Sequence, residues 1–142
     1  MSRGYSDRQP RIGDIFAMQF DGSDSEQHGW RPGLVFQNNI GNDHSPNIIA
    51  LPLTSAIKKT NQPTHVIILS AGTGLRVDSI VLCENPQRMS KSRLGRYITT
   101  LSDEYMAKVA AASLLASAAI SFIEPDVLLS LWQQALSLNT KS

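Results

Sequence analysis

The chain has 142 residues, of which 42% are apolar and 18% charged, and its formal net charge is +1. This length suits one domain with a substantial core, and it is too short for two such domains. A charge so close to zero excludes a globally basic nucleic-acid binder, so any phosphate-binding surface has to be local. No apolar stretch reaches the length of a membrane span, and the opening residues lack the apolar segment of a secretory signal.

Cysteine and histidine usage indicates a chain without a metal site. The single Cys83 lies in the apolar run 79–83, which predicts a buried thiol in a reducing, cytoplasmic compartment. One cysteine and three scattered histidines give no zinc-binding spacing. The turn Gly72-Thr73-Gly74 lacks the rest of a nucleotide-binding fingerprint. We therefore expect no cofactor and no metal.

The first part of the chain favours short strands. Residues 1–11 are expected to form a loose N-terminal arm. Short apolar runs then alternate with turns rich in Gly, Asn and Pro, which is typical of a small, strongly bent sheet or barrel. Strands are expected over residues 14–20, 33–37, 48–51, 64–69, 79–83 and 94–99, with a turn-rich connection over 38–46.

The C-terminal part favours helices. Ser102 is a helix cap, and Asp103 and Glu104 suit the first turn of a helix. A stripe at helical spacing follows and is expected to pack on the sheet. Its members are Met106, Val109, Ala110, Ser113, Leu114 and Ser117. The segment 124–142 is expected to add an amphipathic helix beyond a domain of residues 12–123, and this helix either docks on its own core or contacts a subunit or partner.

Two polar segments place chemically useful groups at the ends of neighbouring predicted strands. The first, residues 25–32, carries the carboxylate of Glu26 and the guanidinium of Arg31 and leads into a buried strand. The second, residues 52–55, carries two hydroxyls where another apolar strand ends. An acid, a permanent cation and a hydroxyl donor can together serve phosphoryl transfer without a metal.

Metal-free cleavage of RNA needs each of these groups. Arg31 offers a planar cationic fork that matches phosphate oxygens, and Thr54 and Ser55 can donate hydrogen bonds to the same oxygens. Glu26 can accept a proton or hold Arg31 in orientation. His28, with a pKa near neutrality in general, is a rival for the proton-transfer role. Spacing alone does not separate this chemistry from an ordinary solvated arginine and its acidic neighbour.

A second basic segment has two interpretations. Four cations cluster without an acid among them, namely Arg88, Lys91, Arg93 and Arg96. They form either a local phosphate-binding surface or an ordinary solvated turn and strand, and charge alone favours neither.

An ordered set of motifs resembles the MazF/PemK family of toxins. It covers roughly residues 12–122. The motifs are Gly13-Asp14-Ile15-Phe16, Ser25-Glu26-Gln27 followed by Arg31-Pro32, Gln37-Asn38-Asn39-Ile40-Gly41-Asn42, Leu53-Thr54-Ser55, Gln62-Pro63-Thr64-His65-Val66, Asp78-Ser79-Ile80-Val81-Leu82, Lys91-Ser92-Arg93-Leu94 and Leu101-Ser102-Asp103-Glu104.

The resemblance implies an α+β fold, a compact SH3-like β-barrel with C-terminal helices, found as a homodimer. It implies ribosome-independent, sequence-specific cleavage of single-stranded RNA to 2′,3′-cyclic phosphate and 5′-hydroxyl ends. Arg31 and Thr54 match the family's catalytic pair, and Glu26 matches a further residue needed for activity. The implied partner is a small antitoxin whose acidic, apolar tail covers the RNA groove. Further residues expected to contact RNA are Ser25, Gln27, Trp30, Asn38, Ser55, Gln87 and Arg88.

The chain departs from the family pattern at several positions. Asp24 stands where many members have Gly, and Gln87 stands in the place of a familiar Arg, with Arg88 one residue later. Trp30 enlarges a position that is often small, and it either stacks on a base or covers the loop. Two alternatives therefore stay open beside the nuclease: a non-enzymatic toxin that inhibits a protein such as gyrase, and an inactive module that binds RNA or antitoxin. The presence of Arg31 and Thr54 favours the nuclease.

Overall fold

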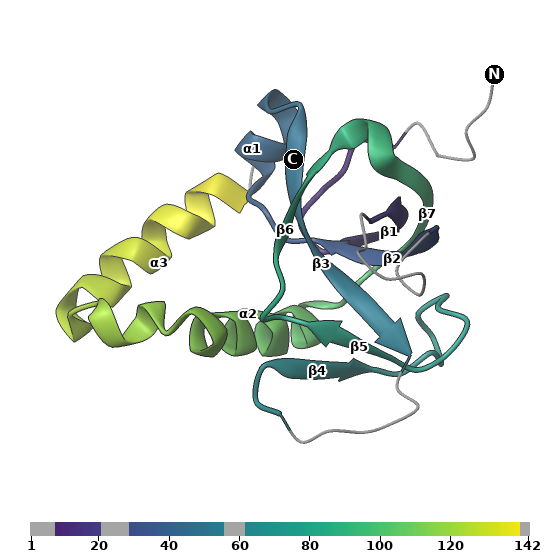
Figure 1. Cartoon of the computed structure of the whole chain (residues 1–142). Coiled ribbons are helices and arrows are strands. Elements are labelled where there is room, and N and C mark those ends of the chain that lie inside the picture. Colours follow the sequence, from purple (N-terminus) through teal and green to yellow (C-terminus); the bar gives the residue numbers. More distant parts are fainter. Residues whose placement is uncertain (1–7, 21–28, 56–61, 140–142) are drawn as a thin grey trace.

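A computed structural model of the chain describes residues 8–20, 29–55 and 62–139. Within these ranges, short strands come first and helices last, with α1 inserted between the second and third strands (Figure 1). The strands are β1 Asp14–Gln19, β2 Trp30–Val35, β3 Asn47–Ser55, β4 His65–Ile68, β5 Ser79–Leu82, β6 Gln87–Ser90 and β7 Leu94–Thr100. The helices are α1 Asn39–His44, α2 Asp103–Ser117 and α3 Pro125–Asn139, with short 3-10 turns at Lys91–Arg93 and Ala119–Phe122.

All strand pairs are antiparallel, in the order β4-β5-β3-β2-β1-β7, and β6 also pairs with β3. The central strand β3 pairs with β2 through residues 50–52, with β6 through 47–50 and with β5 through 53–55. One long strand thus joins two halves of a strongly bent, barrel-like sheet; in Figure 1, β3 runs from beside α1 and β6 down towards β5 and β4. The expected α+β class and SH3-like architecture are confirmed.

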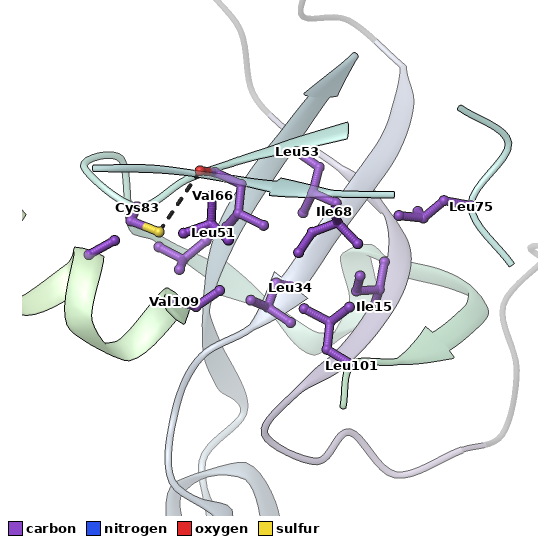
Figure 2. Close-up of a cluster of buried hydrophobic side chains, with 12 residues drawn as sticks. Ile15, Leu34, Leu51, Leu53, Val66, Ile68, Leu75, Cys83, Leu101 and Val109 are labelled. Carbon is purple, nitrogen blue, oxygen red and sulfur yellow. Dashed lines mark hydrogen bonds between the residues drawn. The ribbon is translucent and has the colours of Figure 1, made fainter. Parts of the chain in front are cut away.

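Two apolar clusters lie on opposite faces of the bent sheet. Alternation along β3 sends Leu51 and Leu53 into the first cluster and Ile48 and Ala50 into the second. Figure 2 shows the first cluster, where Val109 of α2 lies beside residues of β2 and β3. This face is therefore closed by α2, while the second face carries part of the candidate site.

Cys83 lies within the first cluster and is only 3% exposed, as the sequence predicted. Its Sγ is 3.9 Å from the carbonyl oxygen of Val81, the contact dashed in Figure 2. Burial raises the pKa of this thiol to about 11, and the nearby Glu84 carboxylate also raises it. The thiol thus behaves as a small apolar side chain.

Helix α1 occupies part of the connection that the sequence predicted as turns. Asn38 caps it by accepting a hydrogen bond from the Gly41 amide at 2.9 Å. The side chain of Asn42 is fully buried and donates to the Gln37 carbonyl at 2.9 Å and to Asn39 Oδ1 at 3.0 Å. One helical turn is held here by side-chain amides, which leave no apolar periodicity in the sequence.

Helix α2 begins where the sequence placed it, but part of the predicted apolar stripe does not face the sheet. The Ser102 hydroxyl caps the helix by accepting from the Tyr105 amide at 3.3 Å. Val109 is fully buried, whereas Leu114 is 42% exposed, and Ser117 is also exposed. Leu114 and Ser117 line a groove between α2 and α3 because the helix rotates this side away from the sheet.

Helix α3 turns back from the end of α2 towards α1 (Figure 1). Ala118, with a left-handed φ of 58°, ends α2 and starts the reversal. Large apolar side chains of α3 stay exposed, including Leu129 and Trp132, both at 60%. The helix therefore carries an apolar surface that its own core leaves largely uncovered. Neither α3 nor any other helix in the described ranges is long and apolar enough to cross a membrane.

Candidate active site

Arg31 and Thr54 lie on one face at the point where β2 and β3 separate. The β2–β3 pairing runs from Val35 opposite Ala50 to Gly33 opposite Pro52. The pairing ends there, but alternation along each strand directs the side chains of Arg31 and Thr54 to the same side as this last pair. From Leu53 onwards β3 turns away to pair with β5. The structure thus brings together one residue from each polar segment that the sequence singled out.

The Arg31 side chain bridges the opening between the two strands. One of its terminal nitrogens, Nη2, donates to the carbonyl oxygen of Leu53 at 3.0 Å. The guanidinium lies 5.6 Å from the centre of the Phe20 ring. Partial burial lowers the pKa of Arg31 by desolvation, yet an arginine stays charged at neutral pH. A partly desolvated cation of this kind interacts more strongly with an anion than one in water.

A glycine leaves space for the aromatic ring under Arg31. A Cβ added to Gly33 would lie 2.5 Å from Sδ of Met18 and 2.8 Å from Cζ of Phe20. Met18 and Phe20 fill the volume that a side chain at this position would take, and both are buried. Sequence reasoning missed this support for Arg31. A glycine inside a strand was the available signal, because it often marks a close approach.

Thr54 and Ser55 are both exposed but serve different faces. Thr54 pairs with Ile80 and Ser55 with Ser79, so alternation directs the two hydroxyls to opposite sides of the strand. Only the Thr54 hydroxyl shares the Arg31 face. The predicted residues Ser25, Glu26 and Gln27 lie outside the described residues, together with Asp24 and His28.

The register also places Gln87 and Arg88. Gln87 pairs with Ala50 and Arg88 with Ile49, so Gln87 shares the Thr54 face and Arg88 takes the other. Ala50, the β3 partner of Gln87, lies four residues from Thr54 along the strand, a distance of about 13 Å. Arg88 donates from Nη2 to the side-chain amide oxygen of Asn47 at 2.9 Å, which is the orientation of that amide that satisfies its hydrogen bonds.

The other predicted contacts are dispersed over the fold. Asn38 is occupied as the cap of α1. Arg93 donates to the carbonyl oxygen of Gln19 at 3.1 Å, and Arg96 lies on β7. The basic segment that the sequence singled out therefore divides among β6, the following turn and β7, and it does not form one continuous patch beside Arg31.

Trp30 precedes Arg31 in β2 and lines a cavity of about 370 Å³. A Cβ on Gly95 would lie 2.8 Å from Cζ3 of the indole, so the ring packs against the backbone of β7. Two further arginines line this cavity, Arg76 and Arg96. Arg76 belongs to the loop between β4 and β5, and no local pattern pointed to it.

In the described part of the chain, no three His, Cys, Asp or Glu side chains gather in a way that could hold a metal ion.

Comparison with known proteins gives a consistent result. Residues 11–115 match the family model described as PemK-like, MazF-like toxin of type II toxin-antitoxin system. Endoribonuclease EndoA of Bacillus subtilis (strain 168) is 45% identical over 98 residues, which is 69% of this chain and 84% of that protein. Endoribonuclease MazF of Staphylococcus saprophyticus is 38% identical over 100 residues, or 70% and 83% of the two chains.

The fold has matches among solved structures. The Mycobacterium tuberculosis toxin MazF-mt6 superposes with a TM-score of 0.61 at 27% identity, over 72% of this chain and 94% of that one. The family model ends at residue 115, so α3 lies outside it.

Proposed function

Because the chain belongs to the PemK-like, MazF-like family of toxins of type II toxin-antitoxin systems, we propose that it is an endoribonuclease toxin. It cuts single-stranded mRNA in the cytoplasm at specific sequences, without a ribosome and without a metal. Two relatives are named endoribonucleases. The observation that supports the proposal is the hydrogen bond from Arg31 to the carbonyl of Leu53, the residue next to Thr54, where β2 and β3 separate.

In the proposed reaction, a ribose 2′-hydroxyl attacks the adjacent phosphorus. The O2′–P bond forms while the P–O5′ bond breaks, which leaves a 2′,3′-cyclic phosphate and a 5′-hydroxyl. The 2′-oxygen loses a proton and the departing 5′-oxygen gains one, so no outside reactant is consumed. Negative charge accumulates on the phosphate oxygens in the transition state, and fixed donors aimed at those oxygens lower the barrier.

Arg31 and Thr54 supply those donors. The hydrogen bond from Arg31 to the Leu53 carbonyl and the Phe20 ring beneath it fix the guanidinium before substrate binds. The exposed Thr54 hydroxyl can donate to a second oxygen of the same phosphate. Glu26 either accepts the proton of the 2′-hydroxyl or orients Arg31. The variant Glu26→Gln separates these roles, because only loss of a proton acceptor removes the acidic limb of the pH–rate profile.

The proposed partners are single-stranded RNA, a small antitoxin and a second copy of the chain. The family description names a toxin-antitoxin system. An acidic antitoxin tail suits a surface where Arg31, Arg76 and Arg96 lie near one another. Exposed apolar side chains on α2 and α3 suit a homodimer, which light scattering would detect as a particle of twice the chain mass.

The test is to incubate the purified protein with a long single-stranded RNA in EDTA and to map the ends by primer extension. We expect discrete cuts with cyclic-phosphate ends, which Arg31→Ala and Thr54→Ala abolish. A matched control, Lys108→Ala, removes an exposed cation from α2 and should cut normally. Intact RNA together with arrested DNA supercoiling would instead indicate a toxin directed at a protein, and bound but intact RNA would indicate an inactive module.

A further inference from the structure

The lining of the cavity beside Trp30 includes Arg31 but not Thr54. Trp30 and Arg31 are successive residues of β2, so their side chains project to opposite faces of the sheet. The cavity lies between β2, β7 and the loop that joins β4 to β5. Its volume of about 370 Å³ falls within the range of pockets that bind small organic groups. The proposed chemistry at Thr54 does not use it.

Trp30 is held as a platform in this cavity. Gly95 has no side chain, and a Cβ there would lie 2.8 Å from Cζ3 and 3.1 Å from Cε3 of the indole. The ring therefore rests on the β7 backbone. It is nevertheless 50% exposed, so one part of the indole stays open to a ligand. A fixed, half-exposed indole is the kind of surface on which an unpaired base stacks.

The loop before β5 adds a positive charge next to this platform. Gly74, at a φ of 78°, approaches β7 so closely that a Cβ would lie 3.3 Å from the Ile98 carbonyl oxygen. This contact brings Arg76 to the cavity that Arg96 of β7 also lines. Within the described residues neither arginine takes part in an ion pair, and the cavity lining includes no aspartate or glutamate.

We propose that this cavity is a subsite for one unpaired nucleotide of the RNA substrate, whose base stacks on Trp30 and whose phosphate binds Arg76 and Arg96. The inference rests on the proposed function and extends it, because it names residues that bind a nucleotide next to the one that is cut. Arg31 lines the cavity as well, so the bound nucleotide is a neighbour of the scissile phosphate. The acidic antitoxin tail can bind the same arginines, but its carboxylates make no use of the flat aromatic face, whereas a nucleotide uses both features.

The test measures binding separately from cleavage. The chain has two tryptophans, so Trp132→Phe leaves Trp30 as the sole indole, and Thr54→Ala prevents cutting. In this double variant, short single-stranded RNA should quench the Trp30 fluorescence. Adding Trp30→Ala should weaken RNA binding, measured by anisotropy of a labelled strand, by roughly 5- to 150-fold. Trp30→Phe should lose less, because it keeps an aromatic face.

A second pair of variants avoids the packing of the indole. Arg76→Ala and Arg96→Ala change exposed side chains. Each should remove one phosphate contact, so the slope of the logarithm of the binding constant against the logarithm of salt concentration should become shallower by about 0.7. The exposed Lys108→Ala is the matched control and should leave the slope unchanged.

The two proposals fail in different ways. RNA that quenches Trp30 and binds more weakly to Trp30→Ala supports the subsite even if the wild-type chain cuts no RNA, an outcome that would refute only the proposed function. Normal cutting by the wild type, with Trp30 fluorescence unchanged by RNA and unaltered binding by Trp30→Ala, overturns the subsite alone. Quenching by an acidic peptide but not by RNA overturns it as well.

Discussion

Gly33 controls the position of the Arg31 guanidinium through a neighbouring side chain. In Gly33→Ala, the new methyl group would stand 2.5 Å from Met18 Sδ and 2.8 Å from Phe20 Cζ. Carbon atoms in good contact are about 3.5–4.0 Å apart, so both groups have to retreat by roughly 1 Å. Both are ends of side chains, which move more readily than backbone. The Phe20 ring lies under Arg31 at 5.6 Å, so its retreat moves the guanidinium.

The expected costs differ for stability and for activity. Overpacking a buried site costs about 1–3 kcal/mol, and the flexibility of Met18 favours the lower half of this range. Since small domains are stable by roughly 5–15 kcal/mol, the variant should stay folded. A shift of about 1 Å in a catalytic group can lower the rate about 100-fold. Cleavage should therefore fall far more than the folded population.

Urea unfolding followed by circular dichroism gives the first quantity, and single-turnover RNA cleavage gives the second. The matched control is Gly41→Ala in α1, whose Cβ would also meet a flexible side chain, at 3.0 Å from Gln37 Cδ. It should cleave RNA at the wild-type rate. If Gly33→Ala loses stability but cleaves as fast as the wild type, Phe20 does not position Arg31 and the reasoning is wrong.

Two further predictions concern buried ionisable groups. Asp14 is fully buried and accepts hydrogen bonds from the Arg8 guanidinium at 2.8 and 3.0 Å, from the Arg11 amide at 3.0 Å and from the Thr100 hydroxyl at 2.7 Å. Asp14→Ala should lower the free energy of unfolding in urea by about 1.5–3 kcal/mol, because the Thr100 hydroxyl and the Arg11 amide lose an ionised acceptor while the partly exposed Arg8 can be hydrated; a loss below about 1 kcal/mol would contradict this. For Cys83, folding raises the thiol pKa to about 11, so stability is retained at low pH and falls as pH rises from about 9 to 11. Cys83→Ala should lack this part of the decline, and identical pH profiles for the two proteins would exclude the thiol as its cause.

Local sequence patterns located the elements that depend on local chemistry. The apolar run of β1 and the Ser102 cap of α2 appear where they were expected. Strand β6 was not foreseen, because its four residues include only one buried apolar side chain, Met89. It forms because β3 offers a free edge there, which is a property of the folded sheet and not of the segment.

The candidate site was foreseen in part for the same reason. Arg31 and Thr54 adjoin strand-like runs, so their placement at neighbouring strand ends followed from the pattern, while their assignment as a catalytic pair stays a prediction. Trp30 projects to the face opposite that of Arg31 because β2 already includes both residues. The strand begins three residues earlier than the apolar run indicated. The contribution of Arg76 depends on how the loop before β5 folds onto β7, which no periodicity encodes.

The most direct test of the central claim is a double-mutant comparison of RNA cleavage rates in EDTA, under single-turnover conditions. The claim is that Arg31 and Thr54 act together on one phosphate. Removing either donor should slow cleavage by about 100- to 1,000-fold, and removing both should cost little more than the worse single change, since groups that act as a unit are not additive. Rapid cleavage by Arg31→Ala or by Thr54→Ala would contradict the account, and so would a double variant whose loss equals the product of the two single losses.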